Sequence, residues 1–100
     1  MRLVPVLAFV CALVVLVPEA RASKARDCAA QGEVVAALVV ARQGGASAEA
    51  AGPQVAGALK GRAADYAPAL PYLVEWVYSL EPAQLGPAVA ESYEAACRAQ

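Results

Sequence analysis

The chain has 100 residues, of which 60% are hydrophobic, and its eight basic and nine acidic residues give a net charge of −1. Nucleic acids and anionic membranes attract proteins through concentrated basic patches, so this charge balance argues against either as a partner. The absence of histidine removes the imidazole on which many metal sites and nucleophilic active sites depend.

Residues 1–22 have the pattern of a secretory signal peptide. A basic start at Arg2 precedes an apolar run over residues 3–17, and residues 20–22 form an A-x-A cleavage site. A membrane-spanning helix needs about 20 apolar residues, so a cleaved signal is favoured over an anchor. We therefore expect cleavage at the end of this segment, with only transient membrane contact. The product is a single small helical domain, residues 23–100, in the periplasm or secreted.

Two cysteines, Cys28 and Cys97, remain after that cleavage, near opposite ends of the 78-residue product. An even number of cysteines in a short exported protein indicates a disulfide, and only one pairing within the chain is possible. Closing a loop of this length stabilises a fold by roughly 4 kcal/mol in the chain-entropy model, which matters for a core this small. The alternative, a reactive thiol, lacks both a C-x-x-C partner and a histidine base.

The first helix of the domain is predicted over Asp27–Gln43. Asp27 is a suitable N-cap, and Gly44-Gly45 supplies the positive φ that ends a helix. Gly32 lies on the apolar side of this helix, where it would let a neighbouring helix approach closely. Helical spacing places the following residues on that side: Cys28, Val35, Leu38, Val39 and Arg42.

Ser47 is the predicted N-cap of a second helical stretch. Proline clashes with the preceding turn and disfavours helix in the residue before it. Gly52-Pro53 is therefore expected to divide the stretch into a short helix to Ala51 and another over Pro53–Lys60. Residues 61–64 are predicted to form a loop.

The third helix is predicted over Pro68–Leu80, where Glu81-Pro82 ends it. Tyr72 and Trp76 lie one turn apart on its flank. A helix that is apolar on nearly all sides is buried, or presents one side to a partner. Its core face is formed by Leu70, Leu73, Val74, Val77 and Tyr78.

The last helix is predicted over Pro87–Ala99, because Gly86 precedes a proline at the first helical position. Cys97 points inward near its end and Cys28 near the start of the first helix, so a bridge makes the two helices antiparallel. No segment alternates with a period of two, so no sheet is expected. The predicted fold is all-α: a small bundle of four to five short helices cross-linked by one disulfide.

Four residues are candidates for partner binding: Tyr72, Trp76, Tyr78 and Arg42. Tyrosine and tryptophan concentrate at interface hot spots, although filling the core of a small domain is the simpler role for all three rings. Joint exposure of Tyr72 and Trp76 would indicate a binding surface or a homodimer interface. Arg42 either interacts with the C-terminus of its own helix or pairs with a carboxylate of the fold or of a partner.

No cofactor, metal or catalytic residue is expected. Zinc and copper would lack histidine and reduced cysteine ligands, and the carboxylates do not have the spacing of a calcium loop. The serines have no histidine to activate them. Glu91 and Glu94 lie three residues apart, but helical spacing turns both away from the core face, as is typical of solvated side chains.

Several of these features occur together in a group of known proteins. A cysteine opens the first helix, Arg42-Gln43-Gly44 closes it, Ser47 starts the second, Val77-Tyr78 lies late in the third, and Cys97 lies close to the end. The chain resembles short, mostly uncharacterised proteobacterial secreted or periplasmic helical proteins with two terminal cysteines. This resemblance implies export, a helical fold and a disulfide, with no activity attached. In size and architecture the chain is also similar to small periplasmic acid-stress chaperones and type VI secretion immunity proteins.

The sequence thus favours an exported, non-enzymatic helical protein that binds another macromolecule, either a protein partner or a second copy of itself. One alternative is a small carrier that holds an apolar ligand among its helices. A further alternative is an acid-stress chaperone or an immunity-type protein of the periplasm.

Overall fold

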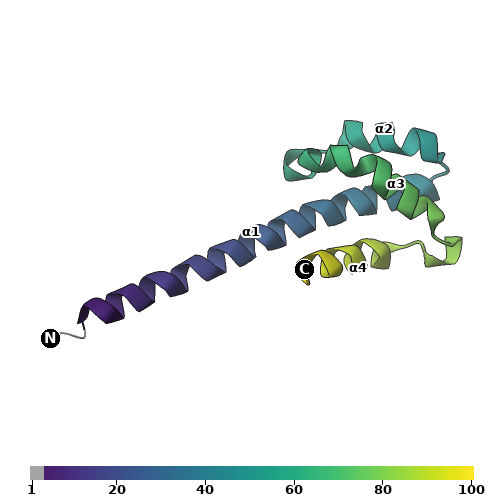
Figure 1. Ribbon diagram of the computed structural model, residues 1–100. Helices are drawn as coiled ribbons and strands as arrows, with labels where there is room; N and C mark the ends of the chain where they lie inside the picture. The colour runs from purple at the N-terminus through teal and green to yellow at the C-terminus, as the bar shows by residue number, and fades with distance from the viewer. Residues whose placement is uncertain (1–3) are drawn as a thin grey trace.

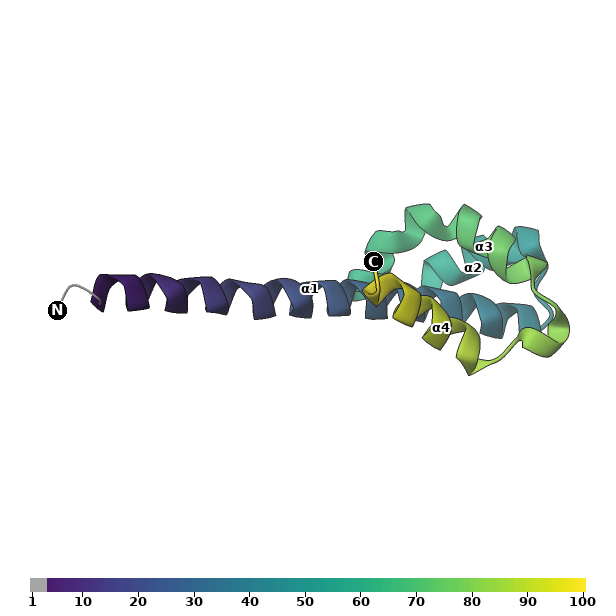
Figure 2. The same ribbon diagram turned by 60° about the horizontal axis from the view of Figure 1, so that its bottom comes forward.

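The computed structural model describes the backbone of residues 4–100 and the side chains of residues 19–100. It contains no strand among these residues, so the predicted all-α fold is confirmed. The other helices gather around the C-terminal half of α1, whose N-terminal half extends away from them (Figure 1, Figure 2). In chain order the elements are α1 Val4–Gln43, α2 Ala48–Ala58, the 3-10 helix η1 Gly61–Ala69, α3 Leu70–Ser79, the 3-10 helix η2 Pro82–Gln84 and α4 Pro87–Arg98.

The prediction that the first helix starts at Asp27 is wrong. α1 already runs as helix from Val4 through this position, and Asp27 forms an ion pair with Arg62 at 2.6 Å instead of capping a helix. Residues 19–26 consist of Ala, Glu, Arg, Lys and one Ser, with no glycine or proline to stop a helix. The side chains of residues 1–18, most of the predicted signal segment, lie outside those described. Within residues 19–100, whose side chains the structure describes, no helix is both long and apolar enough to cross a membrane.

The core is built on the C-terminal half of α1. Val34, Val35 and Leu38 are completely buried there, and Val77 of α3 is buried against them. The predicted apolar side of this helix is therefore confirmed. α1 ends at Gln43, and Gly45 adopts the positive φ, 94°, that the Gly44-Gly45 pair was expected to supply.

The prediction that Gly52-Pro53 divides the second helical stretch is wrong, because α2 runs through Pro53 without a break. The helix begins as expected, with the Ser47 side chain accepting a hydrogen bond from the Ala50 amide at 3.1 Å. Pro53 is exposed and removes only one backbone donor, whereas Ala51 and Val55 on either side of it are buried. The burial of Ala51 and Val55 therefore outweighs the tendency of Gly52-Pro53 to interrupt a helix.

The loop predicted over residues 61–64 is also wrong. Gly61–Ala69 forms a 3-10 helix that leads directly into α3, so the α-helix starts at Leu70 rather than at Pro68. Gly61 enters this element with a φ of 60°, which glycine adopts without steric cost. Ala63 is buried against the core and holds the segment in place.

α4 agrees with its predicted limits to within one residue and runs antiparallel to α1, as expected from the cysteines (Figure 1, Figure 2). The two helices approach closely at Gly32, where an added Cβ would lie 3.4 Å from the Cβ of Glu94. Val89 is the one buried residue of α4. The predicted disulfide between Cys28 and Cys97 is present, with a Cα–Cα distance of 5.6 Å, and it ties the last turn of α4 to α1.

Candidate binding surface

The four residues predicted for partner binding separate into two pairs. Arg42 and Tyr78 lie together where the C-terminal ends of α1 and α3 meet, and both are partly buried. Tyr72 and Trp76 lie one turn apart on the outer flank of α3. The two pairs therefore have to be considered as separate features of the molecule.

Arg42 is used within the fold. Its Nη1 atom donates hydrogen bonds to the carbonyl oxygens of Val77, at 2.6 Å, and of Leu80, at 2.7 Å. These carbonyls belong to the C-terminal end of α3, where backbone acceptors have few partners within the helix; the Val77 oxygen also accepts from the Leu80 amide at 3.3 Å. The guanidinium carbon also lies 5.5 Å from the centre of the Tyr78 ring, within range of a cation–π interaction. One cation thus holds the ends of two helices together.

Tyr78 completes this connection. Its hydroxyl donates a hydrogen bond to the carbonyl oxygen of Ala46, at 2.7 Å, in the turn between α1 and α2. The ring packs against the core while its polar tip reaches a backbone acceptor. Both the ring and the hydroxyl of Tyr78 are therefore engaged in contacts that stabilise the fold.

Tyr72 and Trp76 are exposed together, which was the condition for regarding them as a binding surface. The Tyr72 side chain is 78% exposed and Trp76 is 37% exposed. Exposed aromatic side chains of this size bring apolar area into water that a partner can bury. Val40, on α1, is the other large apolar side chain exposed in the described part of the chain, at 67%.

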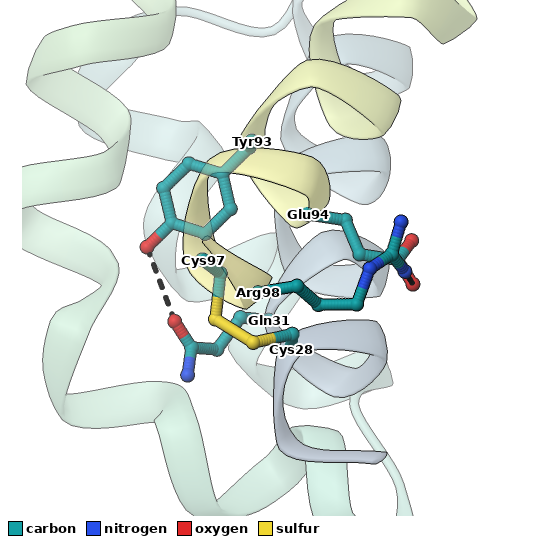
Figure 3. Close-up of a disulfide and its surroundings, with 6 residues drawn as sticks. All are labelled: Cys28, Gln31, Tyr93, Glu94, Cys97 and Arg98. Carbon is teal, nitrogen blue, oxygen red and sulfur yellow. Dashed lines mark hydrogen bonds and ion pairs between the residues drawn. A yellow bond between two sulfur atoms is a disulfide. The ribbon is translucent and has the colours of Figure 1, made fainter. Parts of the chain in front are cut away.

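Tyr93 extends the aromatic pair onto α4. Its ring centre lies 5.7 Å from that of Trp76, and the ring planes are inclined by 43°. Its hydroxyl donates a hydrogen bond to the side-chain oxygen of Gln31 on α1, at 3.3 Å (Figure 3). Sequence reasoning placed Tyr93 on the core face of the last helix and did not connect it with Trp76. We refer to Tyr72, Trp76 and Tyr93 as the aromatic ridge.

A small hollow of 130 Å³ adjoins the ridge beside the disulfide. Figure 3 shows Tyr93 and Gln31 on one side of the Cys28–Cys97 bridge, with the Glu94–Arg98 ion pair on the other. The lining of the hollow is mixed, with an aromatic ring, apolar groups and two amide side chains. Its residues are Gln31, Tyr93, Ala96, Cys97 and Gln100.

Other parts of the surface differ in chemistry: a pocket of 390 Å³ is lined by three alanines and by the charged residues Arg26, Glu33, Lys60 and Arg62. A groove of 350 Å³ between α2 and α3 is almost wholly apolar and includes Gly52, Pro53 and Val74 in its lining. Ser79 donates its hydroxyl hydrogen to the carbonyl oxygen of Trp76, so it serves the end of α3. Among the described residues, no three histidine, cysteine or carboxylate side chains gather as metal ligands would.

Comparison with known proteins gives no relative: no family model, no curated protein and no solved structure matches the chain.

Proposed function

We propose that this chain is an exported, non-enzymatic helical protein that binds another macromolecule through the aromatic ridge. The observation that carries the proposal is the joint exposure of Tyr72 and Trp76 on the outer flank of α3. Large aromatic side chains dominate binding energies because they bury much area and lose little conformational entropy. Arg42 and Tyr78, whose polar groups are engaged within the fold, take no direct part in this binding.

Export is supported by the signal-like pattern of residues 1–22 and by the disulfide, a bond that persists in oxidising compartments such as the periplasm. The side chains of residues 19–26 are all exposed, so the segment around the proposed cleavage site is accessible to a peptidase. The destination that we propose is the periplasm or the medium.

Export makes a direct prediction about mass. Protein recovered from the cell envelope should lack residues 1–22 and carry Ser23 as its first residue, as intact-mass measurement and N-terminal sequencing would show. Ala22→Leu should leave the chain full-length, because signal peptidases require a small residue at the cleavage site. Arg21→Lys, between the two small residues, is the matched control and should be processed normally. Full-length wild-type protein with two reduced cysteines would contradict export.

The binding proposal predicts a large effect of Trp76→Ala. Immobilised oxidised protein should retain an envelope component, and the variant should bind it about thirtyfold more weakly, as expected when a hot-spot residue worth about 2 kcal/mol is removed. Val40→Ala is the control, since Val40 is also a large exposed apolar residue, more exposed than Trp76, but lies on α1. Circular dichroism would confirm that both variants remain folded. Retention that is unchanged in Trp76→Ala contradicts the proposal.

A carrier of a small apolar ligand is the second candidate, and the α2–α3 groove favours it. Its volume of 350 Å³ is within the range of roughly 300–1,000 Å³ found for small-molecule sites, and its lining is apolar. The groove lies on α2 and α3 and does not include Trp76 in its lining. A carrier that used it would be insensitive to Trp76→Ala, so the capture experiment separates the two functions.

A further inference from the structure

Exposed side chains follow one side of the C-terminal half of α1. Between residues 28 and 43 of this helix four side chains are exposed, and the rest are buried or partly buried. At 100° per residue these four fall within an arc of about 80°, so they form a single line along the helix. Val40 is the large apolar member of this line and is 67% exposed. We refer to the four residues as the α1 stripe: Glu33, Ala36, Val40 and Gln43.

A hollow lies on each side of the α1 stripe. One, of 320 Å³, lies between α1 and α2 and includes Gln54 in its lining. The other, of 180 Å³, lies between α1 and α4 and includes Pro87. Ala36 and Val40 line both hollows. The exposed Val40 side chain is therefore bordered on both flanks by space into which a side chain of another molecule can enter.

The α1 stripe is complementary to its own reverse. Its spacings of three, four and three residues are the same from either end. In an antiparallel pair of α1 helices centred midway between Ala36 and Val40, each Val40 faces Ala36 of the other copy. In the same pair each Gln43 faces Glu33 of the other copy. A large side chain is then opposite a small one, and an amide donor is opposite a carboxylate acceptor.

The one charge of the α1 stripe favours the antiparallel arrangement. Glu33 and Gln43 are ten residues apart, which corresponds to about 15 Å along a helix. An antiparallel pair therefore keeps its two Glu33 carboxylates about 15 Å apart, farther than the screening length of about 8 Å at physiological ionic strength. A parallel pair in register would bring the two carboxylates together and would place Val40 against Val40.

We infer that the α1 stripe binds a second copy of this chain in a twofold-symmetric, antiparallel pair. A twofold interface requires one surface that carries both members of every contact. The stripe meets this requirement, because it contains the projecting Val40, the small Ala36 that receives it and a matched pair of polar side chains. The stripe lies on α1, whereas the aromatic ridge lies on α3 and α4, so the inference goes beyond the proposed function and does not depend on it.

Sedimentation velocity tests the inference. The oxidised protein recovered from the cell envelope should dimerise reversibly between about 1 μM and about 1 mM. Val40→Lys should weaken the dimer at least about tenfold, because each new ammonium group would be buried against apolar surface of the other copy. Ala95→Lys is the matched control: it adds the same charge at an exposed position on α4 that lines neither hollow, and it should dimerise as the wild type does. Circular dichroism would confirm that both variants remain folded.

The antiparallel register is tested by a change of charge at its two ends. Gln43→Glu places a like charge opposite Glu33 of the other copy at two symmetric sites, and it should weaken the dimer about tenfold. Addition of Glu33→Lys to this variant should restore wild-type dimerisation, because opposite charges then meet across the interface. The two positions are about 15 Å apart within one copy, so this recovery cannot arise inside a monomer.

Three results would overturn the inference. The first is a wild-type protein that stays monomeric over the whole concentration range. The second is a dimer that Val40→Lys leaves unchanged, since it would form through a different surface. The third is a double variant, Glu33→Lys with Gln43→Glu, that dimerises no better than Gln43→Glu alone.

Discussion

Removal of the Cys28–Cys97 disulfide is expected to release α4 while α1, α2 and α3 remain packed. The bond closes a loop with a sequence separation of 69, and chain entropy assigns roughly 4 kcal/mol to such a closure. α4 lies along α1 but contributes one buried residue, Val89, and the partly buried Ala90 and Tyr93 to the core, so the disulfide is a large part of what holds its last turn. Val89 belongs to the same core, but most of the core residues, among them Leu38 and Val77, lie outside α4.

The double variant Cys28→Ser, Cys97→Ser should therefore lose about 4 kcal/mol in the free energy of unfolding, measured by urea denaturation. This loss is a large part of the roughly 5–15 kcal/mol that stabilises a typical small domain. Amide hydrogen exchange should accelerate in α4 first. Trp76 emission should also shift, because its contact with the Tyr93 ring is lost when α4 moves away.

Reduction of the wild-type protein should give the same changes, whereas a reductant added to the double variant should do nothing further. A loss below about 1 kcal/mol, with the amides of α4 still protected, would show that packing alone holds this helix.

Replacement of Arg42 by methionine is expected to destabilise the fold by about 2–4 kcal/mol. Methionine keeps an apolar stem of similar length but cannot donate to the carbonyl oxygens of Val77 and Leu80. Each hydrogen bond to a charged donor contributes about 1.5–3 kcal/mol. The Val77 carbonyl oxygen still accepts from the Leu80 amide at 3.3 Å, which keeps the expected loss below the sum of two such bonds. The cation–π contact with Tyr78 is lost as well.

Arg62→Met is the matched control, because it removes an arginine whose ion pair with Asp27 is 47% and 39% exposed at its two side chains. Pairs of this kind contribute about 0–1 kcal/mol, so the control should stay close to the wild type. Urea denaturation of both variants measures the difference. Equal effects of the two substitutions would show that the bonds of Arg42 to α3 do not stabilise the fold.

Those elements that end at strong local signals could be predicted from the sequence. Gly44-Gly45 ends α1, Glu81-Pro82 follows α3, and Pro87 begins α4, each within about one residue of its expected place. Glycine and proline act through backbone sterics and missing donors, which do not depend on the rest of the fold. The pairing of Cys28 with Cys97 followed from their number, and it oriented α4 correctly along α1.

The errors occur where local preference and tertiary packing differ. Pro53 indicates a break, but the burial of Ala51 and Val55 keeps α2 continuous. η1 buries a single residue, Ala63, so its sequence has too few apolar core positions for hydrophobic spacing to indicate a helix. The helix was expected to start at Asp27, but the residues before Asp27 have good helix propensity and α1 is continuous through them.

The candidate surface could be predicted only in part. Helical spacing indicated that Tyr72 and Trp76 share a flank, but their exposure depends on how α3 and α4 pack. The same spacing put Tyr93 toward the core and could not show that its ring meets Trp76 from another helix. Arg42 and Tyr78 were grouped with the exposed pair because a sequence does not show which backbone carbonyls they reach.

The unbroken course of α1 past residue 22 bears on the proposed cleavage after Ala22. A peptidase that acts after Ala22 must locally unwind a turn, and the cut then exposes backbone donors that had been bonded to the upstream carbonyls. Ser23 would become the first residue, and serine is among the side chains best suited to accept from such donors. After the proposed cleavage, the shortened α1 would begin at Ser23, whose hydroxyl can accept a hydrogen bond from one of these backbone amides. Cleavage would then leave the N-terminal end of the helix capped, and the remainder of α1, on which the other helices pack, would stay helical.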